Sequence, residues 1–314
     1  MKNKNKKIVI FGAAGLVGHN LCLRLNELGY KNIIAIDKNV NNTKNLKSLG
    51  VCKSVINCDI NDEAAWSKQV NDADIFILSH AQISSMNKND FTVNNIQATQ
   101  KIIDFLENQN DAYVIHISSS VVNSKANDFY TETKEIQEEL VVTSLNNYCV
   151  LRPTLMFGWF DRKHLGWLSR FMSRTPIFPV PGNGKYSRQP LYVRDFCNVI
   201  IGCIEMKPFQ KVYDISGLTK ISYIEIIKGI KKVKKLRSII ISIPVFLFRF
   251  LLNFYSIFSK NPPFTSSQLD ALMIPEDFPT HNWEEIFGIT STPFELALEE
   301  TFTDNKFSEI ELEF

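Results

Sequence analysis

The chain of 314 residues lacks several features that would define its class. Its six cysteines form no Cys-X-X-Cys pair and join no histidine cluster, so we predict reduced thiols and no metal site; they are Cys22, Cys52, Cys58, Cys149, Cys197 and Cys203. The formal net charge is only +2, which gives no global drive toward nucleic acid. The N-terminal MKNKNKK is basic, but the apolar run behind it ends after four residues, which is typical of a solvated tail and not of a secretion signal. We therefore expect a cytoplasmic protein.

An uninterrupted run of about 20 apolar residues, the length that a membrane-spanning helix needs, is also missing. Residues 239–258 come nearest, but Pro244 and Arg249 interrupt them. A helix over residues 245–258 would be apolar on almost every side, so we expect it either to be buried or to lie in a membrane interface. Basic residues just before it would favour the interface; they are Lys228, Lys231, Lys232, Lys234, Lys235 and Arg237. The segment 228–258 therefore predicts either a buried element or peripheral contact with the inner face of a membrane.

Residues 7–37, KIVIFGAAGLVGHNLCLRLNELGYKNIIAID, hold the feature around which the remaining chain is organised. A short β-branched run is followed by Gly12, Gly15 and Gly18 and by leucines at helical spacing, which is typical of a strand, a tight turn and a helix. A second apolar run ends in Asp37. The first glycine permits the turn, the second lets backbone approach a pyrophosphate, and the third lets the helix pack on the strand. Asp37 can accept hydrogen bonds from both ribose hydroxyls, and its charge would repel a 2′-phosphate. We therefore predict NAD as the cofactor, with NADP less favoured.

Apolar runs and helical patterns continue to alternate after Asp37. Strands are expected at residues 54–58, 75–78 and 113–117, with a helix over 91–108. Strict alternation predicts an α/β fold with a doubly wound parallel sheet and helices on both faces. His80 follows the strand at 75–78, where we expect it to pack beside the cofactor and not to act as a base. Asp59 could contact the adenine or could cap a helix that begins near residue 63.

Tyr130 and Lys134 carry the chemistry. They stand four residues apart at the start of a predicted helix, so both side chains project from one face. A neighbouring ammonium group stabilises a phenolate, so Lys134 is expected to lower the pKa of Tyr130 and make it an acid/base group. A serine hydroxyl from the triplet Ser118, Ser119 and Ser120 can orient a substrate oxygen.

These motifs together resemble the extended short-chain dehydrogenase/reductase family, which includes nucleotide-sugar epimerases, dehydratases and reductases. The resemblance covers roughly residues 7–220 and includes the glycine turn, Asp37, the segment 95–99, the serine triplet, Tyr130 with Lys134, and LRPT at 151–154. It implies a Rossmann NAD-binding core over residues 1–155, with later strand contributions around 190–216. A smaller, mainly helical substrate-binding part is implied over residues 156–314, and a homodimer is a further implication.

The resemblance also implies roles for individual residues. Ser120 would orient the substrate, Tyr130 would be the acid/base, and Lys134 would hold the nicotinamide ribose. Ser119, Arg188 and Tyr192 would contact the substrate, with Arg188 as the phosphate partner because a guanidinium offers a bidentate fork. The residues expected to bind the cofactor are Gly12, Gly15, Leu16, Val17, Gly18, Asp37, Asp59, Ile60, Ser79, His80, Ala81, Asn95, Ser118, Tyr130, Lys134, Pro153 and Thr154.

The spacing between Ser120 and Tyr130 departs from the family pattern. Tyr130 stands only ten positions after Ser120, whereas sugar-nucleotide members usually have a longer segment there, so the pocket should be more open on that side. The choice among the three serines stays open. Val121 and Val122 stand where a dehydratase would need an acid, which disfavours dehydration.

Three functions are compatible with this reading. The first is a 4-epimerase or 4-ketoreductase acting on a nucleotide-linked or lipid-diphosphate-linked sugar in surface polysaccharide synthesis. The second is a hydroxysteroid or other lipid-alcohol dehydrogenase. The third is a non-catalytic, cofactor-bound subunit or sensor, although the presence of both Tyr130 and Lys134 argues against it.

Overall fold

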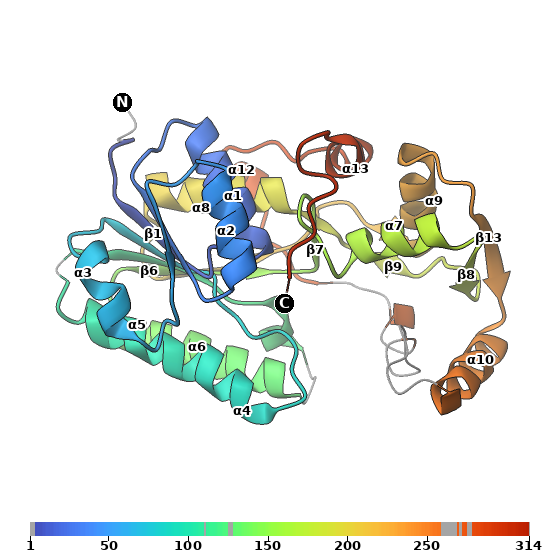
Figure 1. Ribbon diagram of the computed structural model, residues 1–314, viewed down its shortest axis with the longest axis horizontal. Helices are drawn as coiled ribbons and strands as arrows, with labels where there is room; N and C mark the ends of the chain where they lie inside the picture. Colours follow the sequence, from blue (N-terminus) through green and yellow to red (C-terminus); the bar gives the residue numbers. More distant parts are fainter. Residues whose placement is uncertain are drawn as a thin grey trace.

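A seven-stranded parallel sheet forms the centre of the computed structural model (Figure 1). The structure describes residues 4–109, 111–124, 128–258, 269, 272–274 and 278–313. The strands are β1 (Ile8–Phe11), β2 (Ile33–Asp37), β3 (Ser54–Asn57), β4 (Ile75–Leu78), β5 (Tyr113–Ile117), β6 (Tyr148–Pro153) and β11 (Lys211–Ile215). Their order across the sheet is β11-β6-β5-β4-β1-β2-β3, with every neighbouring pair parallel. The predicted doubly wound fold is confirmed, and β1 and β4 meet where the winding reverses, which is where such sheets bind ligands.

Helices cover both faces of this sheet (Figure 1). One face packs against α1 (Leu16–Glu27), α2 (Val40–Ser48), α8 (Val193–Met206) and α12 (Trp283–Phe287). The other packs against α3 (Ser67–Val70), α5 (Ala98–Leu106) and α6 (Phe129–Ser144). Strand β1 shows why both faces need cover. Ile8 and Ile10 are buried in the apolar core on the face that carries α1, whereas Val9 and Phe11 are buried in the core on the face that carries α5. Such full burial contributes roughly 1.5–3 kcal/mol per large apolar side chain.

The helix predicted over residues 91–108 is interrupted by a wider turn. It consists of α4 (Lys88–Phe91), a π-helical segment η2 (Thr92–Gln97) and α5. Two 3₁₀ turns, η1 (Glu63–Ala65) and η3 (Ser120–Asn123), follow β3 and β5. Segments of π-helix often occur at functional sites, and this one carries the buried Asn95.

The second half of the chain builds a separate apolar core from short elements. Three two-stranded sheets pair β10 (Leu191–Tyr192) with β7 (Met156–Phe157), β12 (Ile221–Ser222) with β9 (Ser187–Arg188), and β13 (Ile239–Ile243) with β8 (Ile177–Pro181). Helices α7 (Leu165–Arg174), α9 (Tyr223–Val233) and α13 (Phe294–Thr303) pack around them. A capping box between Ser222 and Glu225 starts α9, because each satisfies a backbone N–H of the other.

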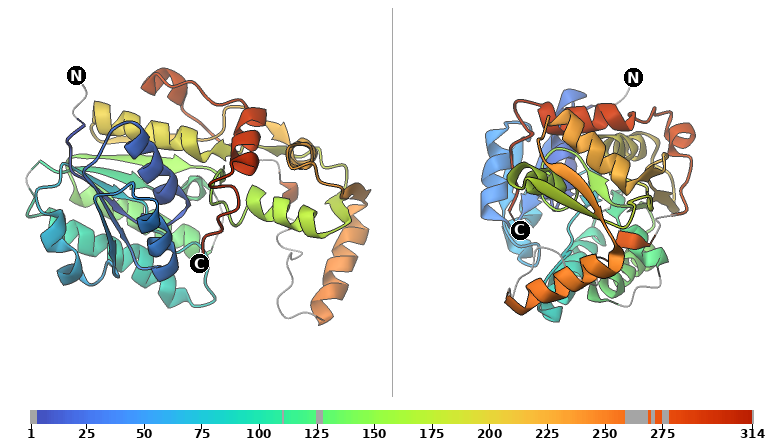
Figure 2. Two further views of the ribbon diagram at one scale, coloured as in Figure 1. Left: turned by 45° about the horizontal axis from the view of Figure 1, so that its top comes forward. Right: turned by 90° about the vertical axis from the view of Figure 1, so that its right-hand side faces the viewer.

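Helix α10 (Val245–Phe258) has the bounds expected from the sequence, and it projects from this half in both views of Figure 2. The rings of Phe246, Phe250 and Phe254 are 76%, 63% and 53% exposed, so burial is the wrong alternative for these three. Among the described residues, no helix combines the length and the apolar character that crossing a membrane requires.

Candidate active site

The glycine turn after β1 is built as the spacing predicts. Gly12 has a φ of +75°, and a Cβ there would lie 2.5 Å from the backbone nitrogen of His80. A Cβ at Gly18 would lie 2.4 Å from the carbonyl oxygen of Ala13, so only glycine lets α1 approach the turn. At Gly15 the nearest atom would be 3.5 Å away. Gly15 is also the N-cap of α1 and has no side chain that could accept a hydrogen bond. The backbone N–H groups of the first turn, including those of the predicted Leu16 and Val17, can therefore donate hydrogen bonds to an anion.

Asp37 holds this turn from the end of β2. Its Oδ2 accepts a hydrogen bond from the N–H of Ala14 at 3.0 Å, and its Oδ1 accepts one from the N–H of Asn39 at 2.9 Å. Burial raises the pKa of the Asp37 carboxyl group, while those two backbone donors and the charge of Lys38 oppose the rise. Asp37 is therefore placed at the mouth of the turn and also fixes its conformation.

Asp59 and Ile60 lie on the next loop. Asp59 accepts from the backbone N–H and the side-chain amide of Asn61, at 2.9 and 3.0 Å, and it makes no cap to η1, whose N-cap residue is Asp62. Lys38 Nζ lies 3.8 Å from Asp59 Oδ2 and donates to Asn94 Oδ1 at 2.5 Å. The capping alternative for Asp59 is therefore wrong.

His80 and Asn95 lie in the buried layer behind the end of β4. His80 Nε2 lies 2.9 Å from Thr99 Oγ1 and 3.1 Å from Gln137 Nε2. Burial lowers the pKa of His80 to about 3, helped by the charge of Lys134, so the ring is a poor base. Asn95 accepts from the N–H of Gln82 at 2.6 Å and donates to Thr133 Oγ1 at 3.0 Å. Asn95 thereby fixes the loop after β4, which carries the predicted Ser79 and Ala81, against α6.

Tyr130 lies in the first turn of α6, which Asp128 caps by accepting from the N–H of Thr131 at 2.9 Å. Burial raises the pKa of Tyr130, and a side-chain hydrogen bond with Ser119 lowers it in part. Ser120 begins η3 and is buried, and no contact of its side chain with Tyr130 is found among the described residues. The intervening residues 125–127 lie outside the described part of the chain, and the opening predicted on that side lies outside it as well.

Lys134 is fully buried one turn further along α6. Its Nζ donates to the carbonyl oxygen of Ile117 at 3.0 Å and to Gln137 Oε1. Burial lowers the pKa of Lys134 to about 7, although the charge of Glu138 opposes this. The expected lowering of the Tyr130 pKa by Lys134 is not observed, because the amine is held by strand β5 and Gln137 instead.

Ser118 belongs to a separate polar group. Its Oγ donates to Glu138 Oε2 at 2.5 Å, and Arg152 Nε donates to both oxygens of that carboxylate at 3.1 Å. Thr154 donates from Oγ1 to the carbonyl oxygen of Gln189 at 3.2 Å, directly after Pro153 at the end of β6. These contacts brace the ends of β5 and β6.

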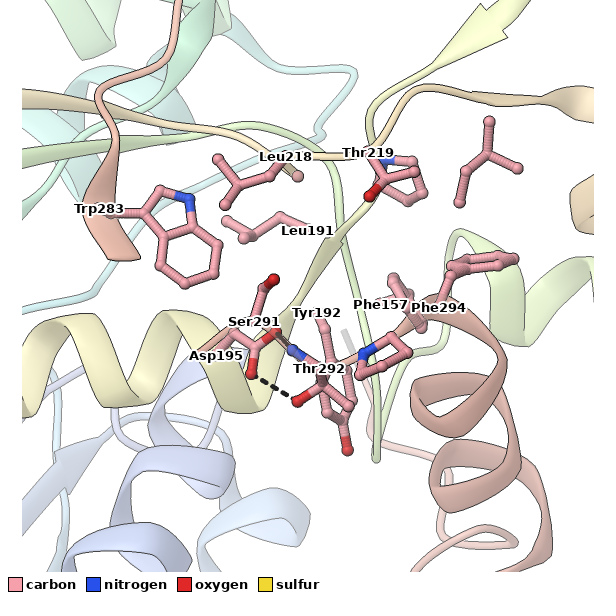
Figure 3. A pocket seen from close by; sticks show the side chains of 14 residues that line it. Phe157, Leu191, Tyr192, Asp195, Leu218, Thr219, Trp283, Ser291, Thr292 and Phe294 are labelled. Carbon is pink, nitrogen blue, oxygen red and sulfur yellow. Dashed lines mark hydrogen bonds between the residues drawn. The ribbon is translucent and has the colours of Figure 1, made fainter. Parts of the chain in front are cut away.

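The predicted substrate residues Arg188 and Tyr192 face two different cavities. Tyr192 lines a cavity of about 290 Å³ in which Thr292 donates to Asp195 (Figure 3). Arg188 is buried in the wall of a larger cavity of about 720 Å³, which we call the groove. The groove lies between α7, β8 and α10, and it reaches Ser84 and Leu155, which follow β4 and β6. The structure therefore brings Arg188, and not Tyr192, to the larger cavity.

Residues that the sequence analysis missed include Thr99, Gln137, Glu138 and Arg152. Gln137 and Glu138 stand three and four residues after Lys134, so helical spacing could have placed them on its face. Arg152 pairs with Glu138 only through the tertiary fold, so its place in the segment 151–154 did not indicate this contact.

Comparisons with known proteins identify the family and agree with the fold. A model of the NAD dependent epimerase/dehydratase family matches residues 8–216. A Dictyostelium discoideum protein named NADH dehydrogenase (ubiquinone) 1 alpha subcomplex subunit 9, mitochondrial, is 26% identical over 274 residues, covering 83% of this chain and 74% of that protein. UDP-glucose 4-epimerase from Thermotoga maritima, solved with UDP-glucose, aligns with a TM-score of 0.73 at 16% identity over 94% of this chain and 97% of that one. UDP-glucuronic acid 4-epimerase from Bacillus cereus, solved with NAD, gives 0.64 at 21% identity over 75% and 87%.

Proposed function

This chain belongs to the NAD-dependent epimerase/dehydratase family, and on that premise we propose that it moves a hydride to or from a ring carbon of a sugar linked to a diphosphate. The proposed reaction is a 4-epimerisation or a 4-keto reduction within surface polysaccharide synthesis. The observation that carries the proposal is the placement of Tyr130 at the start of α6, with Lys134 one turn further along and tied by its hydrogen bond to Ile117 at the end of β5. In the sheet this strand is separated from the glycine turn after β1 only by β4.

NAD is the cofactor of the family, as the sequence predicted. The residues present fit it, because the surface over Gly15 is open to a pyrophosphate and the first turn of α1 presents backbone donors. When bound, NAD accepts or supplies the hydride. We assign Asp37 to the ribose hydroxyls and therefore propose a preference for NAD over NADP.

Tyr130 is the proposed acid/base. During oxidation the sugar C–H bond gives up a hydride, the O–H bond gives its proton to the Tyr130 phenolate, and a ketone forms. Return of the hydride and the proton to the opposite face of the keto sugar yields the epimer. Delivery of a hydride and a proton to a keto sugar that binds from solution yields the reduced product. We assign the orienting hydroxyl to Ser119 in preference to Ser120, because Ser119 is the serine whose side chain lowers the pKa of Tyr130.

A sugar diphosphate suits the groove because Arg188 in its wall can meet a phosphate. The Thermotoga maritima epimerase was solved with UDP-glucose, which is a substrate of this class. We further propose that α10, with its exposed phenylalanines, brings the protein to the inner face of a membrane. We also propose that residues 1–155, with a later strand contribution around residues 190–216 that includes β11, form the cofactor-binding domain, and that the other residues of 156–314 form the substrate-binding part.

A second candidate is a cofactor-bound subunit without catalytic activity. Lys134 favours it, because its amine is engaged by Ile117 and Gln137. The Dictyostelium discoideum relative favours it too, since its name describes a subunit of NADH dehydrogenase.

Incubating the purified chain with NAD and a panel of UDP-sugars separates these candidates. Mass spectrometry and chromatography would identify the product sugar, and nicotinamide absorbance would show whether the cofactor is consumed. An epimerase converts the sugar without net NADH, a ketoreductase consumes NADH, and a non-catalytic subunit binds NAD with no sugar conversion.

A further inference from the structure

The lining of the groove is mostly apolar, with a small number of polar and cationic side chains. Its inner end reaches Ser84 and Leu155, which follow strands β4 and β6 at the edge of the sheet where the glycine turn also lies. From there it runs between α7 and β8 toward α10. The inner end is therefore where a reacting sugar would lie, and the outer part must hold what is attached to that sugar.

Cationic side chains line the groove beside the apolar part. Arg188 is 7% exposed and donates from Nη1 to the carbonyl oxygen of Ile274 at 2.8 Å, which fixes the guanidinium in the wall. Lys163 also lines the groove, and burial lowers its pKa, helped by the charge of Arg162. A diphosphate in the groove could contact both side chains, since guanidinium and ammonium groups are the usual partners of phosphate oxygens.

Among the residues that the structure describes, the outer part is lined mostly by apolar side chains, which offer few partners to a nucleoside. Its walls are Trp167 and Phe171 of α7, Phe178 of β8, and Phe248 and Leu252 of α10. A base and a ribose carry several donors and acceptors, and burying these groups without hydrogen-bond partners is unfavourable. An isoprenoid chain has no such groups and gains from apolar contact.

The outer face of α10 continues the apolar surface beyond the groove. Phe248 and Leu252 face the groove, whereas Phe246 and Phe250 on the same helix are 76% and 63% exposed. A helix with apolar residues on both sides can meet a hydrocarbon chain with one side and a bilayer with the other. A lipid substrate could thus enter the groove without leaving the membrane interface.

We propose that the sugar is carried by an isoprenoid diphosphate, with the diphosphate between Arg188 and Lys163 and the hydrocarbon chain along the groove between α7 and α10. This inference rests on the proposed function, whose substrate class it narrows from diphosphate-linked sugars to those on a lipid carrier.

Isothermal titration of the purified full chain with farnesyl diphosphate, UDP, farnesol and inorganic pyrophosphate tests the inference. We expect farnesyl diphosphate to bind at least about tenfold more tightly than each of the other three, which corresponds to about 1.4 kcal/mol. Tighter binding of UDP would overturn the inference. If farnesol bound as tightly as farnesyl diphosphate, the inference would be overturned as well, because the groove would then recognise only the hydrocarbon chain and not the diphosphate. This comparison needs no variant.

Two substitutions on one helix sharpen the test. Phe248→Asp should weaken farnesyl diphosphate about tenfold or more, because it places a carboxylate in the groove wall. Phe250→Asp, the matched control, should leave that affinity unchanged, and both should keep the affinity for NAD. Equal effects of the two variants would contradict the inference.

The outcome is distinguishable from failure of the proposed function. Conversion of UDP-sugars by a chain that does not bind farnesyl diphosphate would reject the lipid carrier and retain the enzyme. Binding of farnesyl diphosphate, with no conversion of either UDP-linked or lipid-linked sugars, would reject the enzyme and retain the lipid site.

Discussion

Lys134 donates a hydrogen bond from its buried Nζ to the carbonyl oxygen of Ile117, 3.0 Å away. Ile117 is the last residue of β5 and directly precedes the serine triplet, whereas Lys134 lies one helical turn after Tyr130 on α6. The bond therefore ties the helix that carries the phenol to the strand that leads into the serine triplet. It holds together the two segments that carry Tyr130 and Ser119, the groups of the proposed chemistry.

Because the Lys134 amine is buried, we predict that its contribution to the free energy of unfolding rises with pH. Burial lowers the pKa of Lys134 from 10.5 to about 7 in the folded chain, whereas the unfolded chain keeps the ordinary value. Between these values the unfolded state binds the extra proton, so this residue raises the free energy of unfolding by up to about 1.4 kcal/mol per pH unit. Below about pH 7 both states are protonated, and the contribution no longer changes.

Urea unfolding of the wild type and of Lys134→Met, at about pH 7 and about pH 9, measures this contribution. Other titrating groups are common to both chains and cancel in the difference. We expect the wild type to gain stability relative to the variant as the pH rises. A difference that is the same at both pH values would show that Lys134 is charged in the folded state.

Ser119 and Ser120 should differ in their effect on turnover. Ser119→Ala removes the hydrogen bond that lowers the pKa of Tyr130, so the pH at which activity rises should move upward and kcat should fall about tenfold to a hundredfold. Ser120→Ala is the matched control and should change kcat less. A pH profile that moves with Ser120→Ala and not with Ser119→Ala would reverse the assignment.

Asp37 should set the choice between NAD and NADP. Asp37→Asn removes the charge that repels a 2′-phosphate, while the amide oxygen can still accept from Ala14, so the preference for NAD should narrow about tenfold. Asp37→Ala also loses that bond and should weaken both cofactors. Fluorescence titrations with each cofactor provide the affinities, and tighter binding of NADP by the wild type would contradict the assignment.

Helix α10 should bind anionic vesicles in a salt-sensitive way. Phe246→Asp together with Phe250→Asp should abolish sedimentation with phosphatidylserine vesicles, because exposed rings can no longer insert. Substitutions at exposed positions usually change stability by less than about 0.5 kcal/mol, so the melting temperature should be unchanged. Loss of the cooperative melting transition would show that these rings support the fold.

The sequence predicted the parallel sheet and the glycine turn because both depend on local patterns. Strands β1, β4 and β5 have the expected bounds, and Gly12 and Gly18 meet backbone at distances that only glycine allows. The bounds of α10 were also predictable, since its composition is continuous. Its exposure was not, because that depends on whether another element covers it.

The environment of Lys134 could not be predicted from its spacing to Tyr130. That spacing places both residues on one face of α6, but their contacts depend on Gln137 and on the carbonyl group of Ile117. Likewise, Arg188 and Tyr192 are close in sequence and face different cavities, because the chain changes from β9 to β10 between them.

The most direct test of the proposed chemistry compares Tyr130→Phe with the wild type in cofactor binding and in sugar turnover. The substitution removes only the hydroxyl group, so NAD affinity should stay within about twofold while conversion of the sugar falls at least about a hundredfold. Retention of more than a few per cent of the activity by Tyr130→Phe would contradict the account, because the proton would then have to move through another group.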